Sequence, residues 1–165
     1  MRLRILVVAL LLVLPSVVFA RKFSVSTNFL GYAEFGTMNV DASYAISRRL
    51  SLTAGVRYNP FTFYKGDADR QFQFRQQSYS VGVRLWPWHT WSGWWFAAKG
   101  RYQEYNMGGI LSRSTSEGDR LGAGLYCGYT LMLSDHFNLE FGAGAWGGLD
   151  IYRTYDCPVC GVTVD

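Results

Sequence analysis

The chain has 165 residues, with 16 Lys or Arg, 12 Asp or Glu and a formal net charge of +4. It is 49% hydrophobic but only 17% charged, and it has 6 Trp, 11 Tyr, 11 Phe and 18 Gly. This composition excludes intrinsic disorder and argues against a helical bundle, so we expect a single domain of strands that face apolar surroundings on one side.

The first twenty residues have the layout of a secretory signal peptide. Arg2 and Arg4 form a basic start, residues 5–14 are an apolar run, and short residues lead to a cleavage site after Ala20. Residues 5–20 are too few for a membrane anchor, which needs about 20 apolar residues. We therefore expect a mature domain at residues 21–165 with a net charge of +2, which gives no ground for a nucleic-acid partner.

The rest of the chain alternates apolar and polar side chains with a period of two, which is typical of strands with two different faces. One face carries Leu, Val, Phe, Tyr and Ala, and the other carries Gly, Ser, Thr and charged residues. Five segments alternate clearly and the first two fit less well. The seven expected strands are residues 23–33, 37–46, 50–58, 79–86, 94–103, 120–133 and 137–146.

Most of these segments approach the 9–11 residues that a tilted strand needs to cross a bilayer, whereas strands of soluble proteins more often have about five or six. Together with the signal peptide and the aromatic content, this length favours a transmembrane β-barrel with its apolar face toward lipid. A soluble, lipocalin-like barrel is the alternative, because the periodicity does not say which face points inward. No later stretch reaches about 18 apolar residues, so no transmembrane helix is expected.

The connections differ in length as they do in outer-membrane barrels, which have short periplasmic turns and longer external loops. Residues 47–49 and 134–136 are short turns, whereas residues 60–71 and 106–118 are long connections. With the N-terminus in the periplasm, the long connections are external. One of them offers residues that could contact a partner: Phe61, Phe63, Tyr64, Lys65, Asp67, Asp69 and Arg70.

The intermediate connection at residues 87–93 is rich in tryptophan. Trp86, Trp88, Trp91 and Trp94 lie in it or beside it. Because Trp is enriched at membrane interfaces, we expect these side chains in an interfacial aromatic girdle. The alternative is an aromatic core or a ligand platform in a soluble protein.

Charged residues on the polar phase of the strands are expected in the lumen. An eight-stranded barrel is just filled by its interior side chains, so a plug of ion pairs is favoured over an anion-lined pore. Asp41 is a further candidate. The predicted lumen network is Arg57, Arg84, Lys99, Arg101, Arg120 and Glu140.

Three motifs of the mature chain carry a resemblance: YNPF at residues 58–61, LWPWHTW at 85–91 and LSDHFNLEFGAG at 133–144. With them, nearly the whole mature chain resembles an uncharacterised family of Gram-negative outer-membrane β-barrels, known as a domain of unknown function. More distantly it resembles the eight-stranded OmpA-type membrane domain. The resemblance implies a fold and an outer-membrane location, and it transfers no catalytic residue.

The C-terminal end departs from that family, whose members continue into an eighth strand that closes the barrel. This chain stops at Asp165, a few residues after Cys160. Seven strands would leave two open edges in lipid, where unsatisfied backbone groups cost several kcal/mol each. We therefore expect a truncated or frameshifted member.

The cysteines and histidines do not indicate catalysis. Cys157 and Cys160 form a CxxC pair that we expect as a small disulfide or as free thiols, since a redox motif needs a βαβ setting and a zinc site needs two more ligands. Cys127 falls on the apolar phase as a small lipid-facing residue. His89 and His136 fall in expected periplasmic turns, which argues against a Ser–His hydrolase.

The sequence therefore predicts an all-β, antiparallel, up-and-down transmembrane barrel in contact with outer-membrane lipid. Eight strands are expected in the complete form and seven in this chain. No enzymatic activity, metal or cofactor is expected. The predicted role is structural or is recognition through the external loops, and the alternatives are a small pore and a soluble periplasmic carrier.

Overall fold

The computed structural model describes residues 22–64, 72–108 and 114–155, and it consists of one antiparallel sheet and one short helix. The strand path β1-β2-β3-β5-β6-β7-β8 follows chain order, and the two-residue β4 pairs with β5 beside it. The predicted all-β, up-and-down antiparallel fold is confirmed. The elements are β1 (Phe23–Ser26), α2 (Phe29–Ala33), β2 (Met38–Ala45), β3 (Leu50–Asn59), β4 (Thr62–Phe63), β5 (Phe72–Leu85), β6 (Gly93–Gly108), β7 (Thr115–Met132) and β8 (Asn138–Tyr155).

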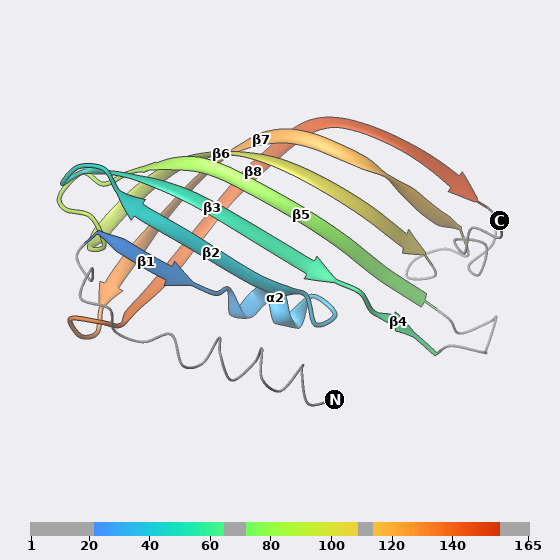
Figure 1. Ribbon diagram of the computed structural model, residues 1–165, viewed down its shortest axis with the longest axis horizontal. Coiled ribbons are helices and arrows are strands. Elements are labelled where there is room, and N and C mark those ends of the chain that lie inside the picture. The colour runs from blue at the N-terminus through green and yellow to red at the C-terminus, as the bar shows by residue number, and fades with distance from the viewer. Residues whose placement is uncertain (1–21, 65–71, 109–113, 156–165) are drawn as a thin grey trace.

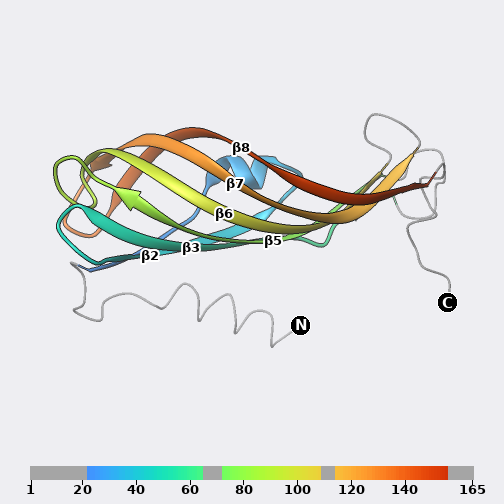
Figure 2. The same cartoon turned by 90° about the horizontal axis from the view of Figure 1, so that it is seen from above.

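The sheet curls into a trough of oblique strands (Figure 1). Seen from above, β8 lies along one wall, and β2 and β3 lie along the opposite wall (Figure 2). The path ends at β1, which pairs with β2, and at β8, which pairs with β7. Because each step along the path is antiparallel, β1 and β8 run in the same direction.

The connections gather at two opposite ends of the trough (Figure 1). Residues 46–49, 86–92 and 133–137 join strands at one end, which we call the turn end. The β1–β2 connection with α2, the strand β4, the end of β6 and the start of β7 lie at the other end, which we call the loop end. β6 and β7 extend into residues 106–118, where a long connection was expected.

The last two strands are longer than the alternation indicated. β7 and β8 pair continuously from Thr115 opposite Tyr155 to Met132 opposite Asn138. Gly147 and Gly148 interrupt the alternation, and the expected strand stopped just before them. Backbone hydrogen bonds do not need alternating side chains, so the ladder continues through these glycines.

Residues 27–33 form a turn and a helix, which corrects the expected strand over 23–33. The side-chain Oδ1 of Asn28 accepts the N–H of Leu30 at 2.9 Å and caps α2. Asn39 on β2 binds the same residue, accepting the N–H of Asn28 at 2.5 Å and donating to its carbonyl at 2.9 Å. These bonds replace those of a strand ladder. Within the described residues, no helix combines the length and apolar character needed to cross a membrane.

The two faces of the sheet are inverted relative to a soluble protein. On β3 the inward Ser51 and Thr53 are buried, whereas the outward Leu52 and Val56 are 45% and 46% exposed. Polar side chains outnumber hydrophobic ones among the buried residues. The same pattern continues along the later strands, where the exposed outward residues include Val81, Val83, Leu85, Phe96, Leu121, Leu125, Phe141, Leu149 and Ile151.

Candidate functional site

Trp86 fills the interior at the turn end. It is fully buried, and its indole N–H donates to Ser51 Oγ at 3.0 Å. Trp95 and Ala97 pack with it in one buried cluster, and the Trp91 ring meets it edge-on at 5.6 Å between centroids. Trp86 was expected at the interface. It lies directly after β5 and continues the inward phase of Arg84, which directs it into the interior.

Trp88 and Trp94 differ from Trp86 because they are exposed, at 76% and 54%. Trp94 lies on the convex face and packs edge-on against Tyr129 at 5.3 Å. Of the four tryptophans predicted for a girdle, these two are exposed. Trp91 is partly buried and packs against the interior cluster.

Three of the predicted lumen cations bind carboxylates on the concave face. One partner, Glu140, was itself predicted for the network, and Asp41 was a further candidate. The pairs are Arg84 Nη1 with Glu140 Oε2 at 2.9 Å, Lys99 Nζ with Asp41 Oδ1 at 3.2 Å, and Arg120 with Asp150.

Asp150 was missed because the expected last strand ended at residue 146. The alternation gave the signal, since Asp150 continues the inward phase of Glu140 and Trp146. Tyr105 also donates a hydrogen bond to Asp150, at 2.8 Å. The ion-pair network therefore extends further toward the loop end than the sequence indicated.

Aromatic rings cover several of the interior cations. The guanidinium of Arg84 lies 4.5 Å from the centroid of the Trp95 ring. Those of Arg101 and Arg120 lie 5.0 Å and 5.6 Å from the Trp146 ring. Aromatic faces attract cations. The predicted residues Arg57 and Arg101 are half-buried and take part in no ion pair within the described part of the chain.

Five phenylalanines gather at the loop end, and we call them the phenylalanine cluster. Their closest rings are stacked at 4.7 Å, between β4 and β5. Tyr64 joins the edge of the cluster at 6.2 Å from the Phe72 ring and is 66% exposed. Of the predicted loop residues, Lys65, Asp67, Asp69 and Arg70 lie outside the described residues. The cluster members are Phe35, Phe61, Phe63, Phe72 and Phe74.

Aromatic residues on the convex face gather toward both ends of the apolar surface. Beyond the loop-end group, the outward residues of β5, β6 and β7 become polar or charged. Tyr102 lies at the boundary between the apolar and the polar outward residues, because its hydroxyl donates to Glu104 and Asp119 at 3.0 Å each. The turn-end group is Phe23, Tyr44, Trp94 and Tyr129, and the loop-end group is Tyr58, Tyr79 and Tyr102.

Within the described ranges, the remaining candidate residues form no reactive constellation. Cys127 is exposed on the convex face, as its strand phase indicated. His89 lies in the β5–β6 turn with its Nδ1 3.0 Å from the Thr90 carbonyl, and His136 lies in the β7–β8 turn. In the described ranges, no three His, Cys, Asp or Glu side chains are placed to hold a metal. The predicted signal peptide and Cys157–Cys160 disulfide lie outside those ranges.

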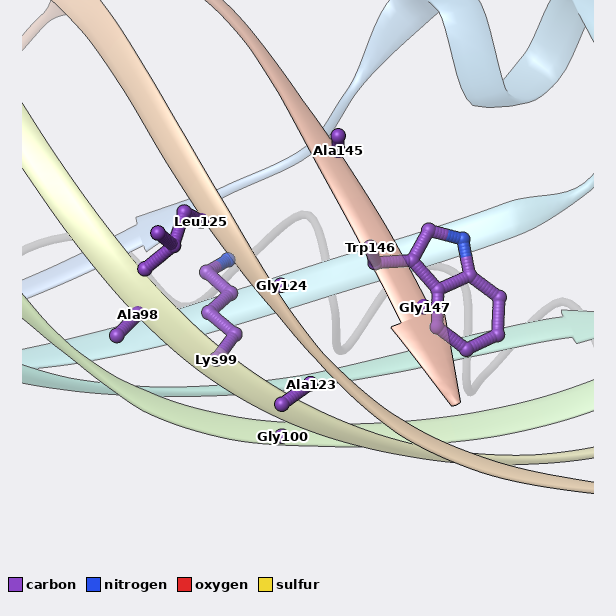
Figure 3. A pocket seen from close by; sticks show the side chains of 9 residues that line it. All are labelled: Ala98, Lys99, Gly100, Ala123, Gly124, Leu125, Ala145, Trp146 and Gly147. Atoms are coloured by element: carbon purple, nitrogen blue, oxygen red, sulfur yellow. The ribbon is translucent and has the colours of Figure 1, made fainter. Parts of the chain in front are cut away.

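A hollow of about 570 Å³ opens over β6, β7 and β8 (Figure 3). Its outward residues are mostly Ala and Gly, and a methyl group added at Gly147 would meet nothing within 4 Å. It therefore offers space for packing on the apolar face and brings no reactive group. The lining residues are Ala98, Lys99, Gly100, Ala123, Gly124, Leu125, Ala145, Trp146 and Gly147.

Comparison with known proteins gives a family match. The model described as Protein of unknown function (DUF3575) matches residues 5–165. No curated protein and no solved structure matches the chain.

Proposed function

The chain belongs to the family Protein of unknown function (DUF3575), and from its structure we propose that it is a non-enzymatic outer-membrane β-barrel protein whose loop end serves in surface recognition. The membership confirms the resemblance to a domain of unknown function that the motifs carry. The OmpA-like character, the signal peptide and the outer-membrane location belong to the proposal.

The inverted sheet is the observation that carries the proposal. Leu125, Leu149 and Ile151 are more than 70% exposed, whereas Thr37, Ser51 and Thr130 are almost completely buried. In water, each exposed large aliphatic side chain forgoes roughly 1.5–3 kcal/mol of burial energy. In a bilayer the same surface contacts hydrocarbon, and the polar side chains find partners inside. The inverted arrangement therefore supports lipid as the surroundings of the convex side.

The size of the apolar surface supports the same environment. On β7 the outward apolar residues run from Leu121 to Leu131. At a rise of about 3.3 Å per residue and a tilt of roughly 40°, this run is about 25 Å tall, close to the apolar band of outer-membrane barrels. The convex aromatic groups lie toward both limits of this band, where interfacial side chains are enriched.

The interior supports a filled barrel more than a pore or a carrier. Trp86, Trp91 and Trp95 pack across the turn end, and the phenylalanine cluster lies at the loop end. The three ion pairs lie on the concave face. A lipocalin-like carrier would need an apolar interior, whereas the buried residues here are mainly polar. Recognition is assigned to the loop end, because exposed aromatic side chains such as Tyr64 are good contact residues.

A pair of leucine substitutions tests membrane insertion. Leu125→Arg places a charge in the middle of the apolar band, and Leu133→Arg places it in the β7–β8 turn, where Leu133 is similarly exposed at 66%. In lipid vesicles, Leu125→Arg is expected to lower the free energy of unfolding by about 2–4 kcal/mol and Leu133→Arg by about 1 kcal/mol or less. Urea titration with heat-modifiable gel mobility measures both. Recovery of both variants in the soluble fraction, with wild-type stability, would refute the proposal.

A further inference from the structure

Arg57, Lys99 and Arg101 form a basic cluster on the concave face around a single carboxylate. Asp41 on β2 binds Lys99, with Nζ 3.2 Å from Oδ1. Asp41 also attracts Arg101, whereas Arg57 repels both Lys99 and Arg101. The exposed Glu34, after α2, adds only a weaker attraction to Arg101. Positive charge therefore exceeds negative charge at this place.

The strand register brings Arg57 and Arg101, which have no ion pair among the described residues, to the two sides of one stretch of β5. Arg57 on β3 lies opposite Ser78, and Arg101 on β6 lies opposite Ser80. Ser78 and Ser80 share the inward phase of β5, so the arginines flank this stretch from its two sides. The serine side chains are short, and the longer arginine side chains extend beyond them into the interior.

Small residues continue on both sides of the arginines. Gly55 precedes Arg57 on the inward phase of β3, and a methyl group there would meet the Asp41 carboxylate first and Ser80 Oγ at 2.9 Å. Gly122 lies opposite Arg101 on β7. The Arg101 guanidinium is placed across this glycine, 5.0 Å from the centroid of the Trp146 ring. Stacking uses the face of the guanidinium, whereas its N–H donors lie in its plane.

Two half-buried guanidinium groups of like charge are stabilised by an anion that both can bind. Arginine donates paired hydrogen bonds to phosphate and carboxylate oxygens, and these charge-assisted bonds are stronger than neutral ones. A phosphate group has enough oxygens to accept from both arginines. Partial burial strengthens such bonds relative to those at an open surface.

We propose that Arg57 and Arg101 bind a phosphate group on the concave face, on the turn-end side of the phenylalanine cluster. The phosphate is that of a free inorganic ion or of a lipid headgroup, since the same donors serve both. This site goes beyond the proposed function and does not depend on it, because it rests on the concave face and the proposed function rests on the convex face.

Calorimetric titration of the full chain, folded in nonionic detergent, tests the site with inorganic phosphate as the probe. Arg57→Gln and Arg101→Gln are each expected to weaken binding by about tenfold or more. Arg75→Gln is the control, because Arg75 is exposed on the outward phase of β5. The affinity of this variant for phosphate should stay within about twofold of the wild-type value. Equal weakening in all three variants would indicate diffuse attraction and would overturn the proposal.

A parallel titration with a short-chain phosphatidylglycerol in phosphate-free buffer separates the two sources. Saturable binding of inorganic phosphate, lost in both glutamine variants, supports a free anion. Binding of the lipid alone, lost in the same variants, supports a headgroup phosphate. The proposal is overturned when wild-type protein binds neither probe.

Folding of the variants is followed by far-UV circular dichroism and urea titration without phosphate. Both glutamine variants should unfold at the same or a higher urea concentration than wild type, because one repelling charge is removed. Clear destabilisation without loss of affinity would show a structural role and would overturn the site. Should the glutamine variants not fold, Arg57→Lys with Arg101→Lys keeps the charge and loses the planar donor fork. Wild-type affinity of that double variant for phosphate would also overturn the proposed site.

Discussion

At the scale of single residues, the ion pair of Arg84 and Glu140 shows how this interior tolerates charge. Glu140 accepts two bonds from Arg84 Nη1, at 2.9 and 3.1 Å, and one from Thr130 Oγ1 at 3.1 Å. The Arg84 side chain is only 7% exposed and its guanidinium lies over Trp95. Removing either charge leaves the other buried without its partner, which costs more than the intact pair contributes.

A double-mutant cycle across this pair gives a clear expectation. Glu140→Leu should lower the free energy of unfolding by about 3–5 kcal/mol, because Arg84 stays charged and buried. Arg84→Met combined with Glu140→Leu should be less destabilised than Glu140→Leu alone, since no buried charge remains. Urea unfolding of the detergent-folded proteins measures each corner of the cycle. Strictly additive effects of the two positions would contradict the coupling.

Strand phase was sufficient to place most of these residues. Arg84, Lys99, Arg120 and Glu140 were assigned to the interior from alternation alone, and the structure puts them there. Asp150, the partner of Arg120, was not predicted because the expected last strand ended at residue 146. Trp86 was assigned by its residue type, which is typical of interfaces, although its phase pointed inward. At this scale, phase predicts orientation better than residue type does.

At the scale of elements, the two-residue period identifies strands but does not exclude a local helix. The segment 27–33 contains apolar residues that extend the alternation of β1, so it was expected to be strand. Its conformation depends on Asn28 and on Asn39, which is eleven residues further along the chain. A side-chain bond to a residue on the next strand is not visible in a local pattern.

The pairing of β7 with β8 gives a prediction for glycine substitutions. Gly128 and Gly142 face each other across these strands, and the Trp95 ring lies over them. A methyl group at Gly142 would stand 2.8 Å from two atoms of that ring. Because Trp95 belongs to the packed turn-end cluster, Gly142→Ala should lower the free energy of unfolding by about 1–3 kcal/mol.

Gly147→Ala is the matched control on the same strand. A methyl group there meets nothing within 4 Å, so the substitution should be neutral or should stabilise by about 0.4–1 kcal/mol through the unfolded chain. Urea midpoints of the two variants, measured in the same detergent, make the comparison. A greater loss for Gly147→Ala than for Gly142→Ala would contradict the packing explanation.

At the scale of the whole molecule, the assignment of inside and outside required the curl of the sheet. The alternation gave two chemically different faces and left open which of them is enclosed. In the structure the polar face is concave and buried, and the apolar face is convex. The orientation that we propose relative to a membrane rests on a separate feature, the separation of the connections into a turn end and a loop end.

Thiol labelling at three depths tests this orientation together with membrane immersion. The native Cys127 lies in the apolar band on the convex face and is exposed. Tyr64→Cys places a thiol at the loop end, and Asp135→Cys places one in the β7–β8 turn. Each of the three thiols is the single cysteine of its variant, because the other cysteines are replaced by Ser. Intact cells and permeabilised cells that express each variant are treated with a membrane-impermeant maleimide.

With the loop end outside the cell, the thiol at position 64 should react on intact cells and the thiol at position 135 only after permeabilisation. With lipid on the convex face, Cys127 should stay unreacted in both cases, because the reagent does not enter the bilayer core. Denaturation in detergent at high temperature should release it for complete labelling. In a water-soluble protein, an exposed thiol on the convex face would instead react at once. Prompt labelling of Cys127 in the folded protein therefore excludes lipid on that face, and reversed labelling of the two ends excludes the orientation alone.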